Sequence, residues 1–582
     1  MKSLSYLNKY FYKYKWSLLI GIFFTFGVNY LFVQMPIIVG NAVDDFENPK
    51  ENWVFLALTI GGIYIGFSIG KGIMLFFQRQ FIIKMSRYIE YDLKNEIYSH
   101  YQRLNFNFYK RNNTGDLMNR ISEDVSKVRM YLGPGVMYSV NLIILFAFVI
   151  FFMIDISPKL TLYVLTPLPI MSFLIYKVSN RMNIQSEEVQ IEQSNISTIV
   201  QESFSGIAVI KTYRGEQNQE NKFSTSSNNY LNKQMSLVKT NALFLPTITF
   251  LIGLSTILTI YVGGILSSNQ INQITSGNIV SFIFYVNMLT WPFASVGWVT
   301  SLVQRAAASQ KRINEFLAEK PEIQNLSNEP FTFKGNIEFK NVSFTYDNSG
   351  IQAVQGLSFS IKSGEKVAIL GKTGSGKSTI INLLMRQINP SVGEILIDNQ
   401  PISKINMDDF RDQIGFVPQE VFLFSDTIRN NVDFANKSDK PLEDHIIQNA
   451  LEESHVWHNI NSFPNQLDTI LGERGVNLSG GQKQRISIAR ALIKKPIFLV
   501  LDDCLSAVDT ETEEIILNNL ETKYENLTML IVSHRVSSIR FADKIIVIEN
   551  GIKVEEGSHK ELFSKQGAYY EIYNKQLLEA EK

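Results

Sequence analysis

The sequence predicts a chain of two parts, a helical membrane domain followed by a soluble α/β domain. Two observations support this: six apolar runs crowd the first 303 residues, and short β-branched runs alternate with helical stretches after residue 334. The average composition hides the division, because 45% of the 582 residues are hydrophobic and 19% are charged. Yet residues 240–304 contain no Asp, Glu, Lys, Arg or His. An even distribution would place about a dozen charges there.

Composition also excludes several classes of protein. The 55 basic and 55 acidic side chains balance, which argues against a protein that binds nucleic acid. Aromatic residues make up 12% of the chain, too many for a disordered protein. Cys504 is the only cysteine, so the chain has neither an internal disulfide nor a multi-cysteine metal site.

Each apolar run is long enough to cross the roughly 30 Å of membrane hydrocarbon as a helix. The runs lie at residues 16–40, 53–77, 133–154, 160–176, 242–266 and 279–303. The first is too long for the core of a cleaved signal peptide, so we expect it to be retained. The alternative, six buried helices of a soluble protein, would need an implausibly apolar core.

The loops between the runs predict their orientation. Residues 78–131 hold ten Lys/Arg against six Asp/Glu, residues 177–241 hold seven Lys/Arg, and residues 1–15 hold four lysines and no acid. The short loops at residues 41–52 and 267–278 together hold one lysine. Because positively charged loops stay inside, we expect the N-terminus, both long loops and the C-terminal half to lie in the cytosol.

Both long loops are expected to be helical. They are about 55 and 65 residues long, and unstructured loops of that length are uncommon. We therefore expect the membrane helices to continue into the cytosol and to turn back near residues 112–116 and Gly206. Lys71 lies inside the second run, where it either marks a functional site or reaches along the helix to the cytosolic interface.

A polar linker separates the two domains. It contains Pro321 and Pro330, so we predict a transmembrane domain over residues 1–320, a linker over 321–334 and an α/β domain over 335–582. Buried strands are predicted at residues 366–370, 497–501, 529–532 and 544–548. Their alternation with helical stretches favours a parallel sheet.

A phosphate-binding loop follows the strand at residues 366–370. Residues 371–378 match GxxxxGK[ST] and open a helical stretch, which is the context that the motif needs. Backbone N–H groups can curl around phosphate oxygens, with Lys377 reaching the outer phosphates and Ser378 a magnesium ion. The residues of the predicted loop are Gly371, Lys372, Thr373, Gly374, Ser375, Gly376, Lys377, Ser378 and Thr379.

Two further motifs extend this site. The apolar run at residues 497–501 ends in Asp502, which places a carboxylate at the sheet edge where ligands bind and where it can hold Mg²⁺ through water. Residues 478–482 read LSGGQ before a helical stretch and form a second anion cradle. One nucleotide does not need two cradles more than 100 residues apart in the sequence.

Together these features resemble the ATP-binding cassette (ABC) transporters, in which LSGGQ lies between the phosphate loop and the apolar strand. Six spans followed by a nucleotide-binding domain are similar to a type IV exporter half-transporter of the multidrug type. The resemblance covers essentially the whole chain. It implies ATP and Mg²⁺ as cofactors, and a lipid bilayer and a second half-transporter as partners. Two nucleotide-binding domains would pair head to tail, with each ATP between one phosphate loop and the other chain's LSGGQ.

The resemblance also implies roles for single residues, each of which alone has an ordinary structural reading. Tyr346 is similar to the aromatic residue that stacks on adenine. The implied catalytic residues are Asp503, His534 and Gln419, and the implied Mg²⁺ ligands are Ser378, Gln419 and Asp502. The residues implied at the partner's ATP are Ser479, Gly480, Gly481, Gln482 and Asp509. Residues 109–118 and 206–214 resemble coupling helices.

The chain departs from the family at Asp503, where a glutamate normally polarises the attacking water. Aspartate is one methylene shorter, so its carboxylate lies roughly 1.5 Å further back, a retraction that can slow hydrolysis about 100-fold. The family includes heterodimers in which one chain carries this aspartate, and we favour that interpretation. The alternative is a homodimer, with two slow sites or with Asp503 still acting as the base.

The expected function is ATP hydrolysis coupled to the export of hydrophobic or amphipathic compounds, drug- or lipid-like, across the cytoplasmic membrane. Closure of the nucleotide-domain dimer would drive alternating access. An ATP-gated channel or regulator with the same architecture is the alternative. It would need charged pore residues or regulatory insertions, and the last two runs contain neither. The sequence does not identify the transported compound.

Overall fold

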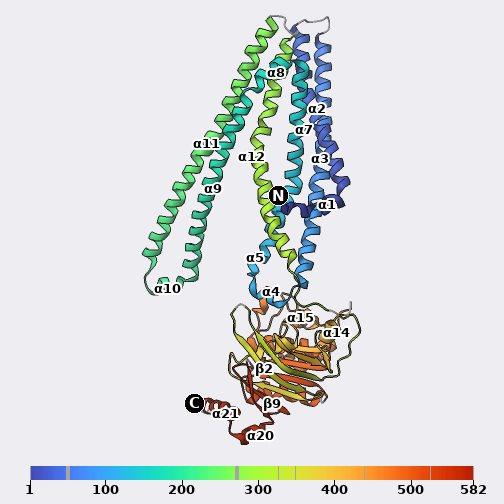
Figure 1. The fold of residues 1–582 in the computed structure, drawn as a ribbon, viewed down its shortest axis with the longest axis vertical. Coiled ribbons are helices and arrows are strands. Elements are labelled where there is room, and N and C mark those ends of the chain that lie inside the picture. Colours follow the sequence, from blue (N-terminus) through green and yellow to red (C-terminus); the bar gives the residue numbers. More distant parts are fainter. Residues whose placement is uncertain are drawn as a thin grey trace. The chain divides into compact units, whose positions relative to one another are not determined.

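The chain forms two compact units (Figure 1). The computed structural model describes residues 2–47, 53–268, 274–325, 327–347, 349–437, 440–506, 508–524 and 526–580. The N-terminal unit comprises Met1–Gln102 and Asn113–Glu319. The C-terminal unit comprises Arg103–Asn112 and Lys320–Lys582. A short helix from the first half of the chain, α4 (Phe106–Arg111), therefore belongs to the C-terminal unit by its contacts.

The described part of the N-terminal unit is helical throughout. Its shorter helices are η1 (Lys2–Leu7), α1 (Asn8–Lys13), α5 (Thr114–Asn119), α6 (Val125–Met130), α8 (Pro158–Leu165) and α10 (Ile207–Thr212). Its long helices are α2 (Lys15–Glu47), α3 (Trp53–Arg103), α7 (Val136–Ile156), α9 (Pro167–Ser205), α11 (Glu216–Ser268) and α12 (Ser276–Ala318). Two π-helical turns, Arg120–Asp124 and Tyr131–Gly135, join α5, α6 and α7.

Five of the described helical stretches are long and apolar enough to cross a membrane. They are Lys15–Glu47, Val54–Arg103, Thr114–Ile156, Glu216–Ser268 and Ser276–Ala318, and they contain five of the six predicted runs. The remaining run, residues 160–176, is divided between α8 and α9 at Thr166. Pro167 explains the break, because proline has no N–H to continue the hydrogen bonds of α8 and is well suited to begin α9.

Several helices continue far beyond a membrane span, as the long-loop sequences predict. The 51 residues of α3 correspond to about 77 Å of helix, more than twice the thickness of membrane hydrocarbon. Helices α9 and α11 run side by side and are joined through α10 (Figure 1). Of the turn predicted at residues 112–116, Asn112 and Asn113 lie between α4 and α5, and the other three residues form the start of α5. The second predicted turn is at Gly206, which precedes α10.

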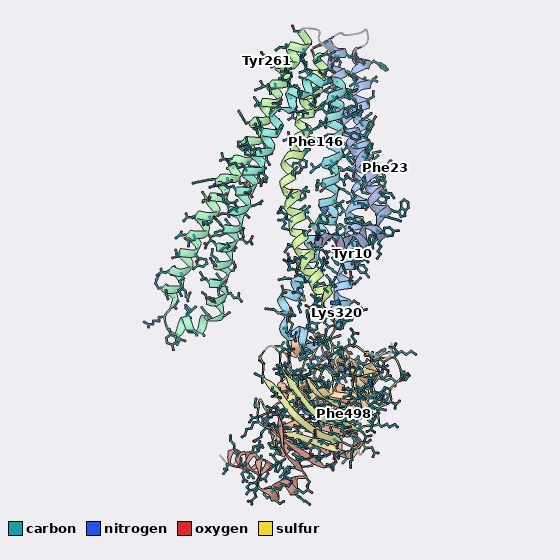
Figure 2. The ribbon with its side chains drawn as sticks, in the orientation of Figure 1. Tyr10, Phe23, Phe146, Tyr261, Lys320 and Phe498 are labelled. Carbon is teal, nitrogen blue, oxygen red and sulfur yellow. The ribbon has the colours of Figure 1, made fainter. Side chains whose placement is uncertain are left out.

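The N-terminal unit combines an apolar core with an exposed apolar surface. Val149 and Phe282 are fully buried in the core, whereas Phe23 and Tyr261 point outward from their helices (Figure 2). Lys71, the charge inside the second predicted run, has its Nζ atom 3.9 Å from the ring centroid of Phe32 on α2. A cation–π contact therefore holds the Lys71 ammonium group.

The C-terminal unit contains two sheets. The six-stranded sheet has the order β10-β9-β3-β8-β7-β6, and all neighbours are parallel except β10 and β9. Its strands are β3 (Lys366–Leu370), β6 (Ile414–Val417), β7 (Phe498–Asp502), β8 (Thr528–Ser533), β9 (Lys544–Glu549) and β10 (Ile552–Gly557). The four predicted buried strands are thus confirmed. Phe498 lies within this sheet and is fully buried (Figure 2).

The second sheet is antiparallel, and helices complete the unit. Its order is β2-β1-β4-β5, from β1 (Ile337–Thr345), β2 (Gln352–Ile361), β4 (Val392–Ile397) and β5 (Gln400–Pro401). The helices are α13 (Lys377–Leu384), α14 (Met407–Asp412), α15 (Ile428–Asp433), α16 (Asp444–Glu453), α17 (Trp457–Asn461), α18 (Gly480–Leu492), α19 (Thr510–Lys523), α20 (His559–Lys565) and α21 (Ala568–Ala580). A separate apolar cluster joins α15, α16, α17 and α18.

Candidate nucleotide site

The loop between β3 and α13 passes very close to neighbouring backbone. A Cβ atom on Gly371 would lie 2.5 Å from the carbonyl oxygen of Ile548, and one on Gly376 would lie 2.2 Å from that of Ala353. Gly376 also has a φ of +99°, a conformation that side chains disfavour. Glycine is therefore required here for two separate reasons, and the loop curls tightly over the end of the central strand.

Lys377 folds back over this loop. Its Nζ atom donates hydrogen bonds to the carbonyl oxygens of Gly371 at 2.7 Å and Lys372 at 2.9 Å. Burial lowers the pKa of Lys377, while the nearby carboxylates of Asp503 and Asp502 oppose that shift. Ser375 Oγ is buried and has no hydrogen-bond partner among the described residues. The loop thus holds a cation and an unsatisfied hydroxyl, which suits a phosphate ligand.

The order of the strands brings the other predicted residues to the same edge of the sheet. β8 lies between β3 and β7, and β6 lies beyond β7. Because these strands are parallel, their carboxyl ends face the same side. Asp502 ends β7, His534 follows β8, and Gln419 follows β6 after one proline. Each side chain is placed by the end of a buried strand.

Asp502 is the most buried carboxylate of the site, with 7% of its surface exposed. Burial and the neighbouring charge of Asp503 raise the pKa of Asp502 to about 6, although Lys377 acts in the opposite direction. A carboxylate that is unfavourably charged in the absence of a cation is well suited to bind one.

Asp503, His534 and Gln419 form a group at this edge. Nδ1 of His534 lies 2.9 Å from each carboxylate oxygen of Asp503. Nε2 of Gln419 donates to Oδ2 of Asp503 at a long 3.5 Å. Since an ionised carboxylate only accepts hydrogen bonds, Nδ1 of His534 donates to Asp503. In the neutral ring Nε2 is then an acceptor, and it donates to a further acceptor such as a phosphate oxygen only when the ring is doubly protonated.

A cavity of about 300 Å³ unites eleven of the predicted residues. They are Tyr346, Thr373, Gly374, Gly376, Lys377, Ser378, Thr379, Gln419, Asp502, Asp503 and His534. Gly371, Lys372 and Ser375 belong to the loop but not to the lining. Ile351 and Ala353 also line the cavity, and no sequence pattern marks them, because they are ordinary apolar positions.

Tyr346 connects this cavity to α4. Its hydroxyl lies 3.1 Å from Oγ1 of Thr379, and its ring packs edge-on against Phe344. The Nζ atom of Lys110 on α4 lies 5.6 Å from the centre of the Tyr346 ring. Arg111, the last residue of α4, forms an ion pair with Asp347 at 3.4 Å. An aromatic residue of the nucleotide cavity thus contacts the helix that was predicted to couple the domains.

The LSGGQ residues lie outside this cavity. Ser479 caps α18: its Oγ accepts from the N–H of Gln482 at 3.3 Å, and its own N–H donates to Oε1 of Gln482 at 3.0 Å. Ser479 and Gly480 are exposed, and Gly481 and Gln482 are half-buried. Among the cavity's described lining residues none comes from this motif. The same holds for Asp509, which is exposed and caps α19 through the N–H of Thr512.

The C-terminal unit is therefore a nucleotide-binding domain built on a phosphate loop, in the same chain as a helical unit with membrane-spanning helices. Comparison with known proteins agrees with this assignment of the two units. Residues 18–293 match the family model of the ABC transporter transmembrane region, and residues 354–506 match the family model of the ABC transporter. The chain belongs to the ABC transporter family, and its ATP-binding domain is an ATPase coupled to transport.

Relatives match over nearly the full length. The chain is 35% identical to the probable multidrug resistance ABC transporter ATP-binding/permease protein YheI of Bacillus subtilis (strain 168), over 98% of this chain and 97% of that protein. It is 34% identical to the multidrug resistance-like ATP-binding protein MdlA of Buchnera aphidicola subsp. Baizongia pistaciae (strain Bp), over 98% of each. A bacterial Atm1-family ABC exporter solved with ATP bound shares the fold, with a TM-score of 0.79, 23% identity and coverage of 96% of this chain and 99% of that one.

Proposed function

We propose that this ABC transporter exports hydrophobic or amphipathic compounds, drug- or lipid-like, across the cytoplasmic membrane. The names of the relatives YheI and MdlA, both of the multidrug resistance type, support this substrate class. The charges of the loops support an orientation with the N-terminus and the nucleotide-binding domain in the cytosol. The boundaries that we propose are residues 1–320 for the transmembrane domain, 321–334 for the linker and 335–582 for the nucleotide-binding domain.

The proposal depends most on one observation: the LSGGQ motif, whose Ser479 and Gly480 are exposed, lies outside the cavity formed by the phosphate loop of the same chain. We infer that Ser479, Gly480, Gly481, Gln482 and Asp509 serve the ATP bound by a second chain. Two nucleotide-binding domains then pair head to tail around two ATP molecules. Because ATP binds better to the paired arrangement, it favours closure, and hydrolysis releases it.

Within the chain's own site, the residues suit ATP and Mg²⁺. The tight loop of Gly371 to Gly376 and the unsatisfied Ser375 hydroxyl support phosphate binding. We assign Lys377 to the outer phosphates, Tyr346 to the adenine and His534 to the γ-phosphate. Ser378, Gln419 and Asp502 would hold Mg²⁺, which when bound neutralises charge on the phosphate oxygens. The remaining loop residues, Lys372, Thr373, Gly374 and Thr379, complete the ATP site.

Asp503 takes the position of the residue that orients the attacking water. Its shorter side chain, held by His534 and Gln419, supports slow hydrolysis at this chain's own phosphate loop. We therefore favour a heterodimer, in which this chain's LSGGQ completes a faster site on a partner with glutamate. A homodimer is the alternative, and co-purification of a neighbouring half-transporter with this chain distinguishes the two.

Transport in inside-out vesicles tests the function. Vesicles containing this chain alone, or with its partner, would be given a panel of hydrophobic dyes and fluorescent lipids. We expect ATP-dependent accumulation of at least one compound, and its loss in Lys377→Ala with unchanged protein level. ATP hydrolysis without accumulation of any compound contradicts the substrate class. An ionic current that needs ATP binding but no turnover would instead support the ATP-gated channel.

A further inference from the structure

The C-terminal helix α21 reaches the nucleotide site through Gln576. Nε2 of Gln576 donates to the carbonyl oxygen of His534 at 2.6 Å, and Oε1 of the same amide accepts from the N–H of Val536 at 2.8 Å. A single planar side chain thus bridges the two backbone groups on either side of Arg535. Both groups belong to the loop that follows β8, and that loop carries the histidine assigned to the γ-phosphate.

Helix α21 is held firmly enough to act as a support for this loop. At its first turn, the carboxylate of Glu555 on β10 accepts from the N–H groups of Ala568 at 3.0 Å and Tyr569 at 2.9 Å. A Cβ atom on Gly567 would lie 1.7 Å from Oε1 of Glu555, so a larger residue there would push this carboxylate away from the two N–H groups. The side chain of Tyr569 is fully buried. Gln576 follows two turns later on this fixed helix.

The bridge holds the backbone next to the His534 side chain. Backbone groups that lie outside a strand need other partners, and here one amide satisfies both. Holding the carbonyl of His534 and the N–H of Val536 restricts the backbone from which the His534 side chain projects. The ring is then held at its other end by Asp503, 2.9 Å from Nδ1. With both ends fixed, Nε2 of His534 keeps a constant position at the sheet edge.

We propose that Gln576 is a positioning residue for the nucleotide site: it holds the loop of residues 534–536 so that His534 is presented to the γ-phosphate. The proposal rests on the role of His534 in the proposed function. Within the described part of the chain, both hydrogen bonds of the Gln576 amide go to backbone groups. Its loss should therefore weaken recognition of the γ-phosphate and leave recognition of the rest of the nucleotide unchanged.

The test compares two competitors that differ in the γ-phosphate. Full-length transporter is photolabelled with 8-azido-ATP, and the label on this chain is competed with AMP-PNP or ADP in the presence of Mg²⁺. Separating the chains by mass restricts the readout to this chain's own site, whether or not a partner is present. In Gln576→Leu, we expect AMP-PNP to compete about tenfold more weakly while competition by ADP changes by less than about twofold.

Two further variants on the same helix sharpen the result. Gln576→Glu keeps an acceptor for the N–H of Val536 but places a carboxylate oxygen against the carbonyl of His534, so we expect the same loss. Leu578→Gln changes a side chain that is 62% exposed and serves as the matched control, with no expected effect. The readout is the strength of competition by AMP-PNP divided by the strength of competition by ADP. If this ratio is unchanged in both Gln576 variants, the proposal is overturned, whatever their thermal stability.

A double-mutant cycle separates this inference from the function on which it rests. If Gln576 acts through His534, Gln576→Leu should have no further effect on the ratio in a His534→Ala background. An equal effect in both backgrounds overturns the positioning role. If His534→Ala lowers the ratio and the Gln576 variants do not, only this inference fails. If His534→Ala leaves the ratio unchanged, the assignment of His534 fails as well.

Discussion

The carboxylate of Asp503 faces the imidazole of His534, with both of its oxygens 2.9 Å from Nδ1. The backbone of Asp503 supports this contact. Its N–H donates to the carbonyl oxygen of Val532 at 2.7 Å, and its φ of +44° lies in the left-handed region that aspartate tolerates better than most residues. The side chain is therefore directed to the loop after β8.

The first prediction is that lengthening this side chain accelerates hydrolysis. Asp503→Glu should raise the ATPase rate of the purified chain, without a partner, by about 100-fold, because a carboxylate moved forward by one methylene can reach the attacking water. The rate of phosphate release measures it. Asp503→Asn keeps the size and removes the charge, so it should not exceed the wild-type rate. Equal rates for wild type and Asp503→Glu would rule out a degenerate site.

The second prediction concerns the stability of the nucleotide-free protein. The pKa of Asp502 is raised to about 6 in the folded state from an ordinary 3.8, so the folded chain binds this proton more tightly than the unfolded chain. The resulting stability is fully present below about pH 4 and is lost as the pH rises through about 6. Asp502→Asn removes the charge and should stabilise the protein at pH 7.5 by about 2–3 kcal/mol.

Thermal unfolding in detergent, followed by tryptophan fluorescence, measures this effect between pH 4.5 and 7.5. The difference in Tm between Asp502→Asn and wild type should shrink as the pH falls below about 6. Asp509→Asn is the control. The carboxylate of Asp509 is exposed and caps α19, and the N–H of Thr512 lowers its pKa, whereas the pKa of Asp502 is raised. If the difference in Tm between Asp502→Asn and wild type does not depend on pH, ionisation of Asp502 does not destabilise the nucleotide-free protein.

The third prediction uses two glycines of the same loop. Gly374 and Gly376 both have positive φ, +83° and +99°, but a Cβ on Gly374 meets nothing within 4 Å, whereas one on Gly376 meets the carbonyl oxygen of Ala353 at 2.2 Å. Alanine at either position costs about 1–2 kcal/mol of backbone strain. Only Gly376→Ala also forces the loop away from β2, so it should abolish the thermal shift induced by Mg-ATP.

Gly374→Ala should retain a measurable thermal shift at a higher ATP concentration. The comparison isolates the steric contact, since the backbone strain is similar in the two variants. If both variants lose nucleotide binding equally, the close approach to Ala353 is not what shapes the loop.

Local patterns in the sequence were sufficient for the phosphate loop, Asp502 and the four central strands, because each depends on neighbours in the chain. Residues such as Ile351 and Ala353 were missed because they become part of the cavity only when β2 packs beside the loop. Gln576 was missed for the same reason: it lies 42 residues from His534 in a polar helix. The hydrophobicity of residues 160–176 predicts one continuous span, whereas Pro167 within this run begins a new helix.

The last prediction separates the structural role of Ser479 from its proposed role at the partner's ATP. Ser479 caps α18, and aspartate and threonine cap helices too. Ser479→Asp and Ser479→Thr should therefore leave the Tm nearly unchanged. The carboxylate of Ser479→Asp, however, would face the phosphates of ATP bound by the second chain, where like charges repel.

We expect Ser479→Asp to lower the ATPase rate of the complex with its partner by about tenfold or more, the scale of losing a hydrogen bond to a charged group. Ser479→Thr should retain most of the rate, since its hydroxyl is kept. In Ser479→Asp, photolabelling of the partner chain by 8-azido-ATP should decrease, whereas photolabelling of this chain should not, because the motif serves the other phosphate loop. Loss of label on this chain instead would place Ser479 at its own nucleotide and contradict the head-to-tail arrangement.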